Sequence, residues 1–280
     1  MDNSFGQNLF YYEKDKFLNY TKLGSGPTNL VFLHGFGASL NTWNDIVIGL
    51  DTTKYSMYLF DLKGFGLSSK PKDDKYSILD QSDIIESFIK TNELSDIILI
   101  GHSYGGGVAL TLNLSFVKKK ANIIKKLILL DCAAFSDEIP FFIRYLQMPI
   151  LNNISLFMSY SFQAKFTLNR LFFDKDKITQ KIINRYIFSF EQKGTKYSFI
   201  KAAKQIVPQN YSSIIKDYNL INNKVLIIWG ENDPVISKSI GYKTRDILKN
   251  SEISIIAECG HIPNEEKPKE TLSLIKKFIE

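Results

Sequence analysis

The chain has 280 residues, of which 44% are hydrophobic and 23% are charged. These proportions are ordinary for a soluble globular protein, and they argue against a disordered chain. The formal net charge of +6 raises the question of nucleic acid or a membrane surface as a partner. However, the lysines are scattered, and the longest basic run, Lys118 to Lys120, follows an apolar stretch as a helix end would. We therefore expect no nucleic-acid partner.

The sequence has none of the usual features of a secreted or membrane-inserted protein. Its two cysteines, Cys132 and Cys259, do not describe a disulfide framework, and we expect both to be free thiols. Residues 1–7 contain an early acid and no apolar segment, unlike a signal peptide. No apolar run approaches the ~20 residues that span a bilayer. We expect a cytoplasmic protein without an integral membrane segment.

Short β-rich runs alternate with helical patterns along much of the chain. Strands are predicted at residues 17–22, 30–33, 55–60, 97–100, 127–130, 225–229 and 253–256. Several are unbroken runs of Ile, Leu and Val, which is typical of strands covered on both faces. Apolar residues at helical spacing predict helices around residues 78–89 and 272–279. This alternation indicates an α/β protein with a mostly parallel sheet wrapped by helices.

The alternation stops between Ala134 and about Tyr218. This segment has no clear buried strand and is rich in Phe and Tyr from Phe135 to Phe199. The regular pattern resumes at Lys224. We therefore expect a core built from residues 1–134 and 218–280, with residues 135–217 inserted as a helical cap. Such a cap would lie at the C-terminal edge of the sheet, where open α/β sheets bind their ligands.

The pentapeptide from Gly101 to Gly105 matches the pattern G-x-S-x-G, with Ser103 at its centre. It follows the apolar run 97–100 and precedes a helical pattern, which is the setting of a nucleophile elbow. The sharp turn requires small neighbours, and Gly101 and Gly105 would let the strand and the helix approach closely. Ser103 is therefore the predicted nucleophile.

A serine nucleophile needs a base, and the chain has three histidines. His102 adjoins Ser103 and cannot readily turn to face it. His34 ends an early strand and is expected to bond its own loop as a scaffold residue. His261 lies in a loop just past the last predicted strand, from which an imidazole can reach the elbow, so His261 is the predicted base.

The base in turn needs a carboxylate that fixes its tautomer. Asp233 follows the run 225–229 and completes the chain order Ser, Asp, His expected for such a site. Glu231 is a local rival, and Asp131, at the end of another buried strand, is a second one. Asp233 is favoured over both by its position in the motif.

Acyl transfer also needs donors that stabilise the developing oxyanion. One is predicted to be the backbone N–H of Tyr104, directly after the nucleophile. The other should come from the loop after an early strand, and the Gly-rich run from His34 to Gly37 supplies one. The N–H of Phe36 is the predicted second donor.

Taken together, these motifs resemble the α/β-hydrolase superfamily, specifically its cap-bearing serine hydrolases. The resemblance extends over almost the whole chain and is carried by residues 34–37, 61–68, 101–106, 230–234 and 260–263. It implies a mostly parallel eight-stranded sheet flanked by helices, with a helical cap insertion. It also implies that Asp61 and the glycines after it shape a core loop.

The residue type at the nucleophile position distinguishes some branches of this superfamily. Haloalkane dehalogenases and epoxide hydrolases use aspartate where this chain has Ser103. Carbon–carbon bond hydrolases keep serine but usually carry an aromatic residue beside the histidine, where this chain has Ile262. Haloperoxidase or perhydrolase activity, acyl transfer and a receptor without turnover remain open alternatives.

The leading prediction is a carboxylesterase that cleaves an apolar acyl ester through an acyl-enzyme intermediate. Its partner would be a small-molecule ester, and the sequence makes no prediction of oligomeric state. No cluster of His and Cys ligands is present, so we expect neither a metal nor an organic cofactor.

Overall fold

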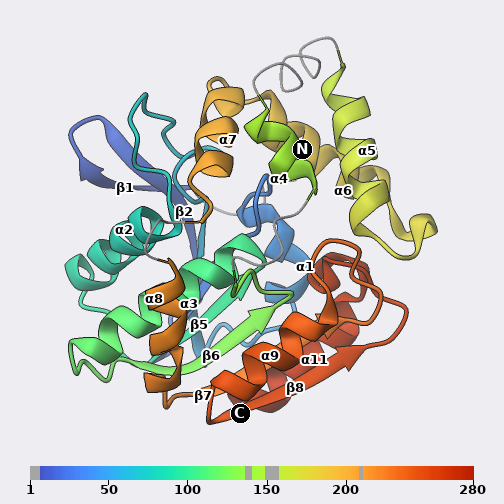
Figure 1. Cartoon of the computed structure of the whole chain (residues 1–280). Helices are drawn as coiled ribbons and strands as arrows, with labels where there is room; N and C mark the ends of the chain where they lie inside the picture. Colours follow the sequence, from blue (N-terminus) through green and yellow to red (C-terminus); the bar gives the residue numbers. More distant parts are fainter. Residues whose placement is uncertain (1–6, 136–140, 149–157, 208–210) are drawn as a thin grey trace.

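The computed structural model describes residues 7–135, 141–148, 158–207 and 211–280. Residues 136–140, 149–157 and 208–210 of the predicted cap therefore lie outside the described residues. The described chain forms one eight-stranded sheet (Figure 1). Its strands are β1 (Asn8–Glu13), β2 (Lys16–Leu23), β3 (Thr28–Leu33), β4 (Tyr55–Phe60), β5 (Ile97–His102), β6 (Ile124–Leu130), β7 (Lys224–Gly230) and β8 (Ser251–Ile256).

The strands lie side by side in the order β1-β2-β4-β3-β5-β6-β7-β8. The pairs β1–β2 and β2–β4 are antiparallel, and every other pair is parallel. The predicted mostly parallel sheet is thus confirmed, and each of the seven strands expected from the sequence is present. The strand that the sequence analysis missed is β1, an edge strand whose side chains are mostly exposed or half-buried.

Helices cover both faces of the sheet, which explains the unbroken apolar runs of the central strands. On one face the core continues into α2 (Ile78–Thr91), α3 (Tyr104–Lys118), α8 (Tyr211–Lys216) and α9 (Lys238–Ile247). On the other face it continues into the 3₁₀ turn Leu40–Trp43, α1 (Asn44–Val47) and α11 (Pro268–Ile279). The short helix α10 (Pro263–Glu266) precedes α11. Among the described residues, no helix combines the length and the apolar character needed to cross a membrane.

The beginning of α2 illustrates how local sequence fixes an element. The Ser77 hydroxyl accepts a hydrogen bond from the Asp80 N–H, and the Asp80 carboxylate accepts one from the Ser77 N–H. This reciprocal capping box satisfies two backbone donors that a helix start leaves unpaired. Ile78, Ile85 and Ile89 then face the core.

Between β6 and β7 the chain forms a group of helices, and we call residues 131–223 the β6–β7 insertion. Its helices are α4 (Phe141–Gln147), α5 (Tyr160–Leu171), α6 (Gln180–Glu191), α7 (Thr195–Lys204) and α8. Figure 1 shows α4, α5, α6 and α7 grouped at the top of the view, whereas α8 returns beside α3. A small apolar cluster of the insertion includes Leu168 and Tyr186, and Ile262 of the sheet domain belongs to it. The insertion is therefore packed against the residue that follows His261.

Candidate active site

Ser103 lies at the turn between β5 and α3, and its backbone is strained. Its φ of 50° and ψ of −114° fall outside the backbone regions that residues other than glycine adopt readily. The neighbouring glycines permit this turn. A Cβ at Gly101 would lie 2.4 Å from the Gly105 carbonyl oxygen, and one at Gly105 would lie 2.3 Å from the Leu33 carbonyl oxygen. The elbow predicted from the sequence is therefore formed, with Ser103 at the N-terminal end of α3.

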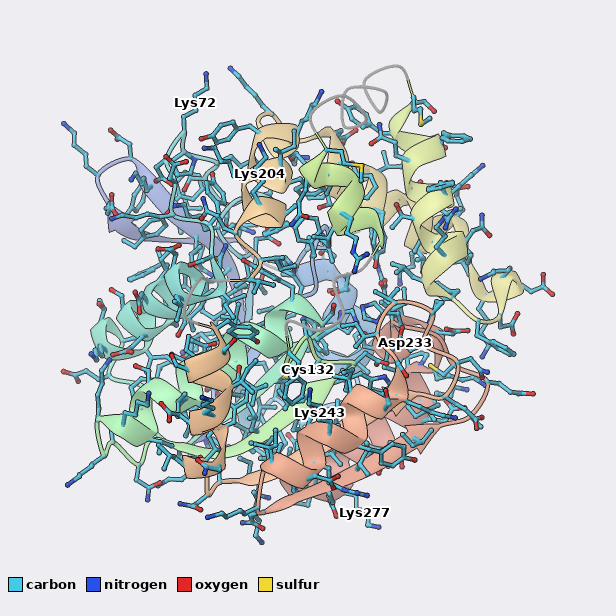
Figure 2. All side chains as sticks on the ribbon, in the orientation of Figure 1. Lys72, Cys132, Lys204, Asp233, Lys243 and Lys277 are labelled. Atoms are coloured by element: carbon cyan, nitrogen blue, oxygen red, sulfur yellow. The ribbon has the colours of Figure 1, made fainter. Side chains whose placement is uncertain are left out.

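His261 connects Ser103 to Asp233 through two hydrogen bonds. Its Nε2 lies 2.9 Å from Ser103 Oγ, and its Nδ1 lies 2.8 Å from Asp233 Oδ2. Asp233 sits on the loop after β7 (Figure 2), and its Oδ1 accepts from the N–H groups of Val235 and Ile236. Because an ionised carboxylate only accepts, His261 must carry its proton on Nδ1. Its Nε2 is then left to accept the proton of Ser103.

The electrostatics favour an ionised Asp233. Burial alone would raise the pKa of this carboxyl, but His261 and the two backbone N–H groups outweigh burial and lower it. The side chains of Asp233 and His261 are almost completely buried, so water competes little for their hydrogen bond. This environment holds the imidazole in one orientation.

The two rival acids occupy different positions. Asp131 is fully buried, and its Oδ1 accepts from the Gly230 N–H at 2.9 Å. Burial, with the nearby charge of Asp233, raises the pKa of Asp131 well above its usual value, which favours the neutral form of this carboxyl. Glu231 is exposed, and its carboxylate lies 3.6 Å from Lys238 Nζ. Of the three candidates, Asp233 is the one hydrogen-bonded to His261.

Asp131, Asp233 and His261 lie close enough together to be considered as a metal site. Among the described residues, Asp131, Asp233 and His261 offer ligand atoms within 4.8 Å of one another. Two of these residues already share the 2.8 Å hydrogen bond described above. A protonated Asp131 would be a poor ligand, because metal ions bind the deprotonated form. The donor set fits an acid–base pair better than a metal centre.

The loop after β3 lies close to the elbow. A Cβ at Gly35 would lie 2.7 Å from His102 Nδ1 and 3.4 Å from Ser103 Cβ, so the absence of a side chain there lets the loop pack against the elbow. Phe36 is the next residue of this loop, and its ring contacts that of Tyr104 at a centroid distance of 6.1 Å. Tyr104 is the first residue of α3, where N–H groups have no partner within the helix. The two predicted oxyanion donors thus belong to segments that meet at Ser103.

The other two histidines support the loops around the site. His34 donates from Nδ1 to the Gly35 carbonyl at 2.7 Å and accepts at Nε2 from the Leu62 N–H at 3.1 Å. His102 donates from Nε2 to the carbonyl of His261 at 2.7 Å. Burial, together with the adjacent His261 ring, lowers the pKa of His102 to about 3, so this ring is neutral. Both histidines act as scaffold, as expected for His34.

Aromatic rings gather around Phe36, on the loop after β3. Phe36 packs against Phe65 and Phe199 at centroid distances of 5.4 Å each. Phe199 also packs against Phe65 at 5.3 Å and Phe190 at 5.9 Å. Phe190 and Phe199 come from α6 and α7 of the insertion, whereas Phe36 and Phe65 come from loops of the sheet domain. The surroundings of the Phe36 loop are therefore apolar and partly supplied by the insertion.

Glu266 joins the insertion to the loop that carries His261, and the sequence analysis did not identify it. Its buried carboxylate accepts from the N–H of Gly260 at 2.7 Å and from the N–H groups of residues 173 and 174 at 3.1 and 2.7 Å. The N–H of His261 also donates to the Leu171 carbonyl at 2.8 Å. The backbone around His261 is thus held in part by the insertion.

Glu265 forms a second connection that the sequence analysis missed. Its carboxylate accepts from Arg185 and from the Tyr186 hydroxyl of α6, each at 3.0 Å. Arg185 also lies 2.8 Å from Asp45, on α1. Burial raises the pKa of Glu265 to about 7, against the opposing effect of Arg185 and Tyr186. The sequence signal was a pair of acids in the first turn of a short helix, which is a common capping pattern and did not stand out.

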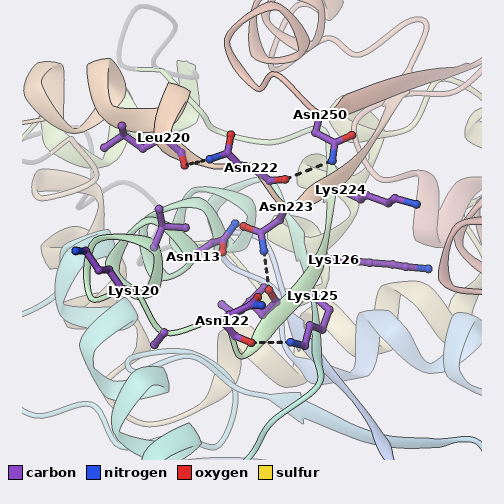
Figure 3. Close-up of a pocket in the computed structure, with 13 residues that line it drawn as sticks. Asn113, Lys120, Asn122, Lys125, Lys126, Leu220, Asn222, Asn223, Lys224 and Asn250 are labelled. Carbon is purple, nitrogen blue, oxygen red and sulfur yellow. Dashed lines mark hydrogen bonds between the residues drawn. The ribbon is translucent and has the colours of Figure 1, made fainter.

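A separate hollow lies at the opposite end of the sheet (Figure 3). It has a volume of about 540 Å³ and is lined by Asn113, Val117, Lys120, Ala121, Asn122, Ile124, Lys125, Lys126, Leu220, Asn222, Asn223, Lys224 and Asn250. The strands β6 and β7 begin here, whereas Ser103 follows the carboxyl end of the parallel strand β5. This hollow is therefore not part of the site around Ser103.

Comparison with known proteins assigns the family. A family model described as alpha/beta hydrolase fold matches residues 28–268, so the chain belongs to the α/β-hydrolase fold family. The crystal structure of an alpha/beta hydrolase fold protein from Burkholderia ambifaria superposes with a TM-score of 0.81. It is 20% identical and covers 96% of this chain and 97% of that chain, which shows a common fold.

Two curated proteins illustrate the relatives of this chain. Lipase 3 of Moraxella sp. is 27% identical over 251 residues, covering 89% of this chain and 76% of that protein. A pimeloyl-(acyl-carrier protein) methyl ester esterase of Wigglesworthia glossinidia brevipalpis is 29% identical over 265 residues. That match covers 92% of this chain and 95% of the esterase. Lipase- and esterase-like proteins are therefore among its homologues.

Proposed function

We propose that the protein is a serine carboxylesterase that cleaves esters with an apolar acyl group. The observation that carries this proposal is the chain of hydrogen bonds from Ser103 through His261 to Asp233, at 2.9 and 2.8 Å. Its setting on a strand–turn–helix elbow supports the same reaction class. The lipase and the methyl ester esterase among the relatives support an ester as the substrate.

In the proposed reaction, Ser103 Oγ attacks the ester carbonyl carbon and its proton passes to His261 Nε2. Asp233 holds the imidazole by its Nδ1–H and stabilises the imidazolium. The protonated His261 then donates to the leaving alcohol as the carbon–oxygen bond breaks, which leaves the acyl group on Ser103. A water molecule gives a proton to His261 and attacks this acyl-enzyme, releasing the acid and restoring the serine.

The negative charge that develops on the carbonyl oxygen needs donors that are already in position. We assign this role to the backbone N–H groups of Phe36 and Tyr104. The N-terminal end of α3, directly after Ser103, adds the positive end of a helix dipole. Gly35 supports this assignment because it lets the Phe36 loop lie close to Ser103.

We further propose that residues 135–217 act as a cap that sets acyl preference. The rings of Phe190 and Phe199 support this role, since they come from the insertion and reach the aromatic group beside the oxyanion loop. A Cβ placed at Gly37 of that loop would lie 3.7 Å from each of the two rings, so the loop passes close to both. An acyl chain leaving Ser103 in this direction would meet apolar surface.

The test is a panel of chromogenic esters that differ in acyl chain length. Wild-type protein should hydrolyse them with a preference for apolar acyl groups, and Ser103→Ala should reduce turnover by a factor on the order of 10⁴. The folded double variant Phe190→Ala/Phe199→Ala should shift the chain-length profile. Tyr11→Ala, which removes an exposed ring on β1, is the matched control and should not shift it. Full turnover by Ser103→Ala would contradict the esterase proposal, and an unshifted profile in the double variant would contradict the cap's role.

A further inference from the structure

The positive charge of the protein is concentrated in one part of the β6–β7 insertion. Residues 158–207 contain ten Lys and Arg residues and three Asp and Glu residues, a net charge of +7. The whole chain has a net charge of +6, so all other residues together carry a net −1. The other 25 Lys and Arg residues of the chain are balanced by 26 Asp and Glu residues. The excess of cations over acids therefore lies in this segment.

Large apolar side chains are exposed in the same region. Five of them lie within residues 158–173 and are between 39% and 52% exposed: Met158, Tyr160, Phe162, Phe166 and Phe173. Single exposed apolar residues are ordinary, but neighbouring ones mark an interaction surface. The rings of Phe162 and Phe166 do neighbour each other, since they stack at a centroid distance of 6.2 Å.

Figure 1 shows α5, which carries both rings, at the edge of the insertion. The inner face of the helix buries three residues at helical spacing, Ala164, Leu168 and Leu171, beside α6. At about 100° per residue, Phe162 and Phe166 point away from this buried face. Lys165 and Arg170 fall on the two opposite flanks of the pair of rings. We call Phe162, Lys165, Phe166 and Arg170 the outer face of α5.

The charges of this face all have one sign. The twelve residues of α5 include two cations and no Asp or Glu. The guanidinium of Arg170 lies 4.5 Å from the centroid of the Phe166 ring, so the cation and the aromatic ring form one surface. Aromatic rings at the centre with cations at both flanks are typical of helices that lie in the interface of a bilayer. The rings enter the boundary of the acyl chains while the cations stay among the headgroups.

We propose that the outer face of α5 docks the protein on an anionic membrane surface. Lys165 and Arg170 complement the negative potential of anionic lipids, and Phe162 and Phe166 supply the apolar contact. A second copy of this chain is a poor occupant, because two faces of the same positive charge repel each other. An acidic protein would satisfy the cations but would give the two central rings no acyl layer to enter.

Binding to vesicles tests this proposal. The assay needs no substrate, so its result does not depend on whether the protein hydrolyses esters. The full chain is floated with vesicles of phosphatidylcholine alone or of an equal mixture with phosphatidylglycerol. The mixture should bind at least about tenfold more tightly, since each cation near an anionic surface contributes a factor of about five. Phe162→Ser/Phe166→Ser should weaken that binding by about a hundredfold, because both rings leave the interface. Both rings are exposed, so the fold should tolerate the change.

The matched control uses another exposed aromatic residue beside an arginine. Tyr242, on α9, is 38% exposed, and the Arg245 guanidinium lies 5.3 Å from its ring. Tyr242→Ser should bind the mixed vesicles like wild type. Equal binding to both vesicle compositions would overturn the proposal. Unchanged binding by the Phe162→Ser/Phe166→Ser variant, with complete loss in high salt, would also overturn it and would favour an acidic protein as the partner.

Discussion

The strained backbone of Ser103 leads to a prediction about stability. A residue with a side chain is held there at a φ of 50° and a ψ of −114°, whereas glycine adopts these angles without strain. Ser103→Gly and Ser103→Ala both remove the hydrogen bond to His261, so that loss cancels when the two variants are compared. Ser103→Gly should therefore be the more stable of the two, because only this variant also relieves the strain.

The size of the difference follows from two opposing effects. Strain of this kind costs about 1–3 kcal/mol in the folded state. Glycine also makes the unfolded chain more flexible, which costs about 0.5–1 kcal/mol relative to alanine. The balance leaves Ser103→Gly more stable by about 1 kcal/mol, or a rise in Tm of about 2–4 °C for a chain of this size.

Denaturant unfolding and thermal melting of both variants under identical conditions measure this difference. Ser115, inside α3, provides the control. Ser115→Gly should be less stable than Ser115→Ala by about 1 kcal/mol, because glycine is unfavourable in a regular helix. The sign of the glycine–alanine difference should thus reverse between positions 103 and 115. If Ser103→Gly is no more stable than Ser103→Ala, the elbow is not strained and the reasoning fails.

Three further predictions concern the buried acids. Asp233→Asn should lower ester turnover by about 10⁴, whereas Asp131→Asn should stay within about tenfold, because Asp233 is the acid hydrogen-bonded to His261 and the raised pKa of Asp131 favours its neutral form; equal losses would make Asp131 the acid partner. The pKa of Glu265 is about 7 in the folded state, whereas its ordinary value of 4.5 applies to the unfolded state. The Tm of wild type should therefore fall relative to Glu265→Gln as the pH rises from about 4.5 to 7, and a constant difference would refute this. Glu266→Gln should lower kcat about tenfold, since the Gly260 N–H loses a charged acceptor next to His261; an unchanged kcat would show that the loop is held without it.

The sheet could be predicted from the sequence because its central strands are covered on both faces. Strands β6 and β7 contain the runs 127–130 and 225–228 of Ile, Leu and Val, whose side chains are all buried, and such runs are visible without knowledge of the fold. Strand β1 shows the limit of this approach. It lies at the edge of the sheet, pairs with β2 alone and buries none of its side chains fully, so its sequence gives only a weak pattern.

The proposed active site likewise contains residues that the sequence could identify and residues that it could not. Ser103 directly follows β5, and Asp233 and His261 lie three and five residues after the ends of β7 and β8, so local motifs are enough to identify them as candidates. The contacts of Glu265 and Glu266 could not be predicted in this way, because their partners in the insertion lie 79 to 93 residues away in the sequence. The basic outer face of α5 was also hidden, since it depends on which side of the helix is buried.

Covalent labelling of Ser103 tests the central claim of this account most directly. Wild-type protein is incubated with a fluorophosphonate, which reacts with activated serine nucleophiles, and its intact mass is measured. One adduct is expected, mapped to Ser103 by peptide analysis, absent from Ser103→Ala and formed much more slowly by His261→Ala. A wild-type protein that stays unlabelled, or an adduct that persists in Ser103→Ala, would contradict the assignment of Ser103 as the activated nucleophile.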